Sequence, residues 1–162
     1  MQAPWHKMLD QLLDRRPTVG RLVALCEENY RLLLRLAPAL REMRGDYLAR
    51  CPGHADLQLT ILEQGPYTTL VRLTHRFGDD RHPAEPDAVL RVYHDAREVE
   101  AVTLRQSALP TEVLYEPPGL CNKWRLNWFL GKWLGFCGTL DYRFVPRTVE
   151  SAPSAACLPA AT

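Results

Sequence analysis

The chain has 162 residues, of which 46% are hydrophobic and 24% charged, as in an ordinary globular domain with its own core. Its 20 basic and 19 acidic residues leave a net charge of +1, which argues against a nucleic-acid partner and against binding to an anionic membrane. The sequence lacks the run of about 20 apolar residues that spans a bilayer, and its first eight residues lack the pattern of a secretory signal. We therefore expect a cytoplasmic protein.

Two helices are predicted in the N-terminal part. The first covers residues 4–14 and forms an N-terminal extension within residues 1–17. Thr18 is a suitable N-cap for the second helix, over residues 19–37, which Pro38 ends. Apolar side chains recur in the second helix at spacings of three and four, which indicates one buried face.

The periodicity then changes from helical to alternating. Residues 57–61 and 67–74 alternate apolar and polar side chains around Gly65-Pro66, which predicts an antiparallel hairpin. Residues 78–87 are polar and contain prolines, so we expect a loop, and residues 89–94 then form a third strand.

Helix signals return after the third strand. Asp95 and Glu98 match an Asp-x-x-Glu capping pattern, which predicts a short helix over residues 96–106, with extension of the strand through Val99 as the open alternative. The last helix is expected between Asn122 as N-cap and Gly138 as C′ residue. The tail over residues 146–162 lacks periodicity and is expected to be disordered.

These elements predict an α+β fold in a single domain over residues 18–145. A small antiparallel sheet of at least three strands is expected to pack against the N-terminal and the C-terminal helix. Five scattered cysteines indicate free thiols rather than a disulfide framework.

Four segments resemble the YqiB-like family, small bacterial cytoplasmic proteins built around a domain of unknown function. The Tyr-Thr-Thr-Leu and Tyr-His-Asp-Ala motifs are the most specific parts of the segments Leu25–Pro38, Tyr67–Val71, Val92–Arg97 and Asn127–Leu134. The resemblance covers most of residues 20–140 and implies a small, soluble cytosolic protein. It implies no activity, since the family has no established chemistry to carry over.

A candidate binding site lies where the third strand ends. Strand alternation places Tyr93 and Asp95 on one face and His94 on the other, so adjacency does not make a His–Asp dyad, and we assign Asp95 to helix capping. His94 could bind a ligand near neutral pH. The candidate ligand-binding residues are Glu63, Tyr67, Tyr93, His94 and Arg97.

Other motifs give weaker signals. Cys51-Pro-Gly-His54 has the spacing of half a zinc site, with His75 and His82 as candidates to complete it, but the second short-spaced pair is missing. We therefore predict no metal and no cofactor. A basic surface could form from arginines on the sheet and its flanking segment, although a mixed solvated face is the default interpretation. The arginines concerned are Arg72, Arg76, Arg91, Arg97 and Arg105.

The last helix carries a candidate interface. Gly131 and Gly135, one turn apart, indicate that another backbone element lies close, either the protein's own sheet, which we favour, or a second subunit. Trp124 and Trp128 are the candidate interface residues.

The sequence contains no complete catalytic set. We therefore expect an uncharacterised, non-enzymatic binding or regulatory module, which binds an unknown protein partner or itself. The alternative is a protein that binds a small molecule or nucleotide, and could be an enzyme, with its pocket near Tyr93, His94 and Arg97.

Overall fold

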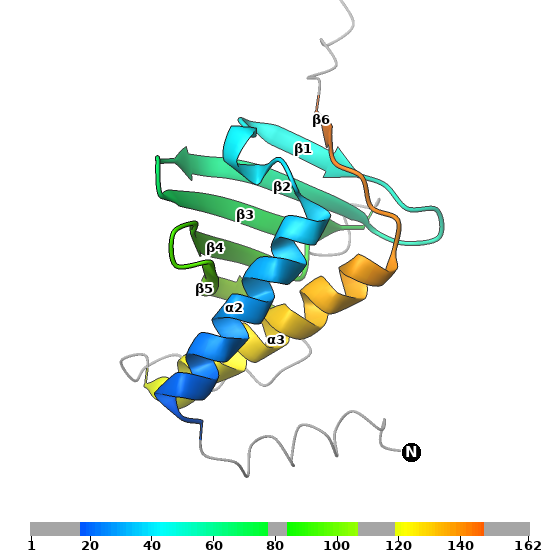
Figure 1. Ribbon diagram of the computed structural model, residues 1–162. Coiled ribbons are helices and arrows are strands. Elements are labelled where there is room, and N and C mark those ends of the chain that lie inside the picture. Colours follow the sequence, from blue (N-terminus) through cyan, green and yellow to red (C-terminus); the bar gives the residue numbers. More distant parts are fainter. Residues whose placement is uncertain (1–16, 78–83, 107–118, 148–162) are drawn as a thin grey trace, which may run out of the picture.

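A computed structural model describes residues 17–77, 84–106 and 119–147, which form an antiparallel sheet with two long helices on one face (Figure 1). The predicted α+β class, with an N-terminal and a C-terminal helix packed on an antiparallel sheet, is confirmed. The predicted helix over residues 4–14 and most of the tail lie outside the described residues.

The sheet has six strands in the order β5-β4-β3-β2-β1-β6. Strands β1 to β5 follow one another as a meander, and β6 pairs with β1 at the far edge. The strands are β1 (Asp46–Ala49), β2 (Asp56–Gln64), β3 (Thr68–Arg76), β4 (Asp87–Tyr93), β5 (Glu98–Arg105) and β6 (Val145–Pro146).

The first helix, α2 (Val19–Leu36), begins where the sequence predicts. The Thr18 hydroxyl accepts a hydrogen bond from the Arg21 amide at 3.2 Å, and Ala37 is the C-cap before Pro38. A short 3₁₀ helix, η1 (Leu40–Glu42), then leads into β1. The N-cap hydroxyl pairs one of the amides that a helix start leaves free.

The core lies between the helices and one face of the sheet. Alternate side chains of each central strand point to this face, so that Leu59, Leu73 and Leu90 are completely buried. They meet Leu33 of α2 and Leu130 of α3 (Leu120–Thr139) in one apolar cluster. Each fully buried leucine contributes about 1.5–3 kcal/mol relative to an exposed one.

The predicted helix over residues 96–106 is wrong, because this segment forms β5. The chain turns after His94, and Arg97 takes a left-handed conformation with φ of 55° at the end of the turn. Glu98 then pairs with Tyr93, which makes β4 and β5 a hairpin rather than one long strand. Asp95 therefore lies in a turn and caps no helix.

Two predicted bounds of the last helix are also corrected. The N-cap of α3 is Gly119, so Asn122 lies in the first turn, and Gly138 lies inside the helix, which ends at Thr139. Within the described ranges, neither α2 nor α3 combines the length and the apolarity that a bilayer crossing needs.

Gly131 lies at a close approach of the two helices. A Cβ at this position would lie 2.8 Å from Oδ1 of Asn29, a buried side chain whose Nδ2 donates to the Asn127 carbonyl at 3.0 Å. The close neighbour is therefore α2 and not the sheet, contrary to the prediction. Gly135 has no such neighbour within 4 Å.

The two glycines should respond to alanine with opposite signs. Gly131→Ala should lower the free energy of unfolding by about 1–2 kcal/mol, because the new methyl group displaces the bonded Asn29 side chain. Gly135→Ala should raise it by up to about 1 kcal/mol, because alanine favours the helix and finds open space. Urea denaturation of both variants measures the difference, and equal stabilisation by both would contradict the packing of α2 on α3.

Candidate functional site

Most of the predicted ligand-binding residues lie at the end of the sheet where the β2–β3 and β4–β5 turns meet. The His94 amide donates to the Tyr67 carbonyl at 2.9 Å, and Tyr93 pairs with Thr68. Glu63 on β2 and Arg97 in the β4–β5 turn are both exposed, and the Tyr67 side chain is 66% exposed. The structure therefore brings the backbones of Tyr67, Tyr93 and His94 together.

The side chains of Tyr93 and His94 point to opposite faces of the sheet, as alternation predicts. The Tyr93 hydroxyl donates to Oε1 of Glu100 on β5 at 2.9 Å, on the face away from the helices. The His94 ring is 6% exposed and packs edge-on against Tyr30 of α2, with the ring centroids 6.2 Å apart. The two side chains therefore do not line a common pocket.

The hydrogen bonds around His94 determine its tautomer. The Gln64 amide nitrogen donates to the carbonyls of Leu40 and Met43, so the Gln64 oxygen accepts from the Thr69 hydroxyl. Thr69 must then accept a proton from Nε2 of His94, 2.8 Å away. Nδ1 of His94 is left unprotonated and, among the described residues, without a partner.

His94 is held in its neutral form. Burial lowers its pKa below the ordinary value of 6.5, and the positive charge of Arg41 lowers it further, against the smaller opposing effects of Asp95 and Glu42. The bonds from Gln64 through Thr69 to His94 join the η1 segment to the sheet. They give His94 a structural role at this position.

His75 lies in a second buried polar group, between β3, α3 and the chain after α3. Nδ1 of His75 accepts from the Trp133 indole at 3.1 Å, and Nε2 lies 3.4 Å from the Tyr142 hydroxyl, which itself donates to the Ala55 carbonyl at 2.6 Å. Burial lowers the pKa of His75. Both ring nitrogens are therefore engaged within the protein.

These contacts bear on the half zinc motif. The two ring nitrogens of His75 already have protein partners, His54 is exposed, and His82 lies outside the described residues. Across the part of the chain that the structure describes, no three histidine, cysteine or acidic side chains are grouped so as to hold a metal ion.

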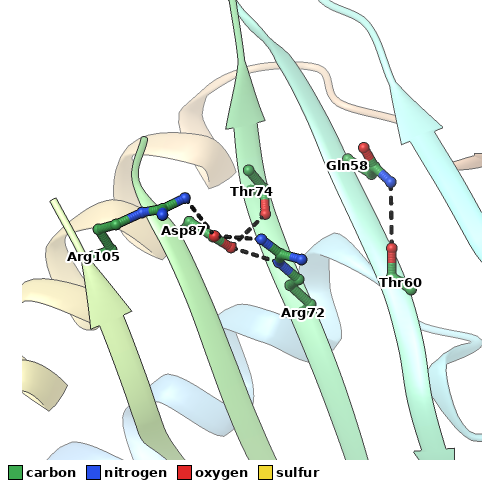
Figure 2. A network of polar contacts seen from close by, with 6 residues as sticks. All are labelled: Gln58, Thr60, Arg72, Thr74, Asp87 and Arg105. Carbon is green, nitrogen blue, oxygen red and sulfur yellow. Dashed lines mark hydrogen bonds and ion pairs between the residues drawn. The ribbon is translucent and has the colours of Figure 1, made fainter. Parts of the chain in front are cut away.

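A charged network lies on the face of the sheet away from the helices, which we call the open face (Figure 2). Asp87 at the start of β4 accepts two hydrogen bonds from Arg72, at 2.8 and 2.6 Å, one from Thr74 at 2.8 Å and one from Arg105 at 3.1 Å. Hydrogen bonding by Arg72 is the main reason that the pKa of Asp87 is lowered. The network spans β3, β4 and β5.

The network borders a shallow hollow of the open face. Arg72, Asp87 and Arg105 form its polar side, and Leu62 and Val89 form its apolar side. Sequence reasoning missed Asp87 because it assigned residues 78–87 to a loop. The alternation of β4 continues back to Asp87, two residues before Val89, and this signal could have placed Asp87 beside the arginines.

The solvent side of α3 carries aromatic and basic side chains. Trp124 and Trp128 are half-buried, Nζ of Lys132 lies 5.5 Å from the centroid of the Trp128 ring, and Phe136 is 50% exposed. These residues lie away from the core face of α3, which is formed by Leu130, Trp133, Leu134 and Cys137. An aromatic surface therefore remains open to contact on this helix.

Comparison with known proteins relates the chain to uncharacterised proteins. The family model described as "Protein of unknown function (DUF1249)" matches residues 32–143. The "Uncharacterized protein YqiB" of Escherichia coli strain K12 is 30% identical over 126 residues, which cover 75% of this chain and 89% of the relative. The YqiB proteins of E. coli O6:H1 and O157:H7 match at the same 30% identity and coverage. No solved structure matches significantly.

Proposed function

We propose that this chain, which belongs to the DUF1249 family of proteins of unknown function, is a non-enzymatic binding module that holds an acidic protein partner on its helices. Membership confirms the resemblance to YqiB-like proteins and assigns no activity. The observation that carries the proposal is the aromatic and wholly basic solvent side of α3. We define the docking surface as this side of α3 together with the exposed side of α2.

The apolar side chains of α3 exceed what the core requires. Four of its side chains already form a core face, and a helix packed on a sheet needs one such face. Trp124, Trp128 and Phe136 add apolar surface on another side of the helix. Phe136 is exposed and the two tryptophans are half-buried. Aromatic side chains at the surface beyond the needs of the core are typical of interaction sites, and tryptophan often dominates their binding energy.

The charges of the docking surface favour an acidic partner over a second copy. Arg125 and Lys132 are the exposed cations on the solvent side of α3, Lys123 is exposed near the start of its core-facing side, and this helix has no carboxylate. Helix α2 adds three arginines against two glutamates. The helices therefore carry a net charge of +4, while the whole chain carries +1. Two copies that met through this surface would repel each other, whereas an acidic surface would be attracted.

Peptide binding tests this proposal. The probe is a synthetic amphipathic peptide with leucine and phenylalanine at helical spacing and glutamate elsewhere, and its control replaces every glutamate with lysine. We expect isothermal titration calorimetry to detect the acidic peptide alone. Lys132→Glu should weaken binding about tenfold, because it replaces attraction by repulsion beside Trp128.

A matched variant and the oligomeric state complete this experiment. Arg50→Glu reverses an exposed charge on the chain after β1, outside the docking surface, and should leave peptide affinity unchanged. Equal binding of the acidic and basic peptides would overturn the proposal. So would a stable dimer in sedimentation that binds no acidic peptide, since self-association would then occupy the surface.

The alternative function, a small-molecule or nucleotide site near Tyr93, His94 and Arg97, has less support. Tyr93 and His94 face opposite sides of the sheet, and Arg97 is exposed in the β4–β5 turn. A ligand that contacts Tyr93 from the open face would be separated from the His94 ring by the sheet itself.

A further inference from the structure

We propose that the hollow on the open face binds an oxyanion, a carboxylate or phosphate, that carries an apolar group. Arg72 and Arg105 would hold the anion, and Leu62 and Val89 would contact the apolar group. This face is turned away from α2 and α3 (Figures 1 and 2), so the site is independent of the docking surface.

The Asp87 carboxylate has no capacity for a further donor. A carboxylate offers about four lone-pair sites. Oδ1 accepts from Nε of Arg72 and from the Thr74 hydroxyl, and Oδ2 accepts from Nη2 of Arg72 and Nη2 of Arg105. The Asp87 side chain is only 10% exposed. A cationic or donor ligand would therefore find no free acceptor on Asp87.

The two guanidinium groups, in contrast, have donors to spare. Each guanidinium carries five N–H groups. Arg72 uses two of its nitrogens on Asp87, and Arg105 uses one. Their side chains are 49% and 65% exposed. Two cations against one anion leave a surplus positive charge, with directional donors that suit a carboxylate or phosphate.

The surrounding strands hold these groups in place. Asp87 pairs with Thr74 on β3 and with Arg105 on β5, so the network joins three neighbouring strands. Glu98 and Glu100 pair with Tyr93 and Arg91 at the opposite end of β5 and do not neutralise the network. Asp87 accepts hydrogen bonds from two nitrogens of the Arg72 guanidinium and so fixes its orientation. We therefore regard Asp87 as a positioning residue. Such preorganisation lowers the entropy that a ligand loses when it binds.

The apolar side of the hollow defines the rest of the ligand. Leu62 is 48% exposed at the bulge of β2, and Val89 is half-buried on β4, where it pairs with Arg72 on β3 and with Thr103 on β5. Burial of a short alkyl or aromatic group against them contributes about 25 cal/mol for each Å² of apolar surface removed from water. Free inorganic phosphate, which has no such group, should bind more weakly than an alkyl carboxylate.

The test compares ligands with head groups of opposite charge. Octanoate and octylammonium have alkyl chains of similar length, and inorganic phosphate supplies an oxyanion without an alkyl chain. We expect octanoate to shift the amide and guanidinium NMR signals of Arg72 and Arg105, phosphate to shift them at higher concentration, and octylammonium to leave them unchanged. Equal shifts with octylammonium, or none with octanoate, would overturn the proposal.

Variants separate a binding role from a structural one. Arg105→Gln should weaken octanoate binding about tenfold, since it removes a charge-assisted donor but keeps a polar side chain. Arg50→Gln removes another exposed, ion-paired arginine, next to Asp56, and should have no effect. Unchanged octanoate affinity in Arg105→Gln would overturn the proposal, because the network would then only stabilise the pairing of the strands. Lys132→Glu should leave octanoate binding intact. The proposal for the open face and the proposal for the docking surface can therefore fail independently of each other.

Discussion

Leu90→Ala should lower the free energy of unfolding by about 2–5 kcal/mol. Leu90 lies at the middle of β4, between Val71 and Ala101 on the neighbouring strands, and its side chain is completely buried beneath the helices. Alanine would leave a cavity that the paired strands on both sides cannot close. Urea denaturation at neutral pH measures the loss, which is large beside the total stability of about 5–15 kcal/mol of a typical domain.

The neighbouring residue supplies the control. Val89 lies on the open face and is half-buried, so Val89→Ala should cost less than about 1 kcal/mol. The two positions are adjacent in the chain and differ chiefly in the face to which they point. Equal losses in both variants would contradict the assignment of the helices to one face of the sheet.

The alternating strands and α2 could be predicted because their evidence is local. Leu57 and Leu59 alternate with polar residues, and so do Val71 and Leu73, and the structure buries all four against the helices. Thr18 and Pro38 bound α2 through their own hydrogen-bonding properties, which do not depend on distant contacts. The fold class followed from these elements.

Strand β5 could not be predicted because two local signals coincided. Asp95 and Glu98 have the spacing of a capping box, but the same residues bound a tight turn that Arg97 completes in a left-handed conformation. Left-handed arginine is rare, so the sequence favoured a helix. Pairing with β4 decided the outcome, and Asn127 of α3 also contributes, since its Oδ1 accepts the Ala101 amide at 2.9 Å.

The candidate sites depended on contacts between distant segments. The sequence offered Arg72 and Arg105 only as candidates for a basic surface, with a mixed solvated face as the default. Asp87, which accepts hydrogen bonds from both, comes to them through pairing of β4 with β3 and β5. The tautomer of His94 likewise follows from Gln64 and Thr69, which lie 30 and 25 residues earlier in the chain. Alternation along β4 indicates which face Asp87 occupies, but the contacts of Asp87 with the arginines, and of His94 with Gln64 and Thr69, come from pairing between strands.

Acid should destabilise the protein in two separate pH ranges. His75 and His94 are neutral in the fold, and burial lowers both pKa values below 6.5. As the pH falls below 6.5, the unfolded chain gains protons that the folded protein does not, so stability falls until the folded pKa values are reached. Each histidine contributes about 1.4 kcal/mol for every unit by which folding lowers its pKa. The pKa of Asp87 is lowered from 3.8, so its contribution is lost only in stronger acid.

Chemical denaturation at a series of pH values tests which histidine causes the loss of stability below pH 6.5. The variants replace each histidine with a side chain that does not titrate. His94→Gln keeps a donor for Thr69, and His75→Asn keeps an acceptor for Trp133, so each should remove its own share of the pH dependence. His54→Gln, at an exposed position, should change the slope only slightly, because burial lowers the pKa of His75 more than the charge of His54 does. A stability that stays constant from pH 7 to pH 5 would show that both buried rings accept a second proton in the fold. Nδ1 of His94 is buried and has no partner in the described part of the chain, which argues against that result, since a proton there would lack an acceptor.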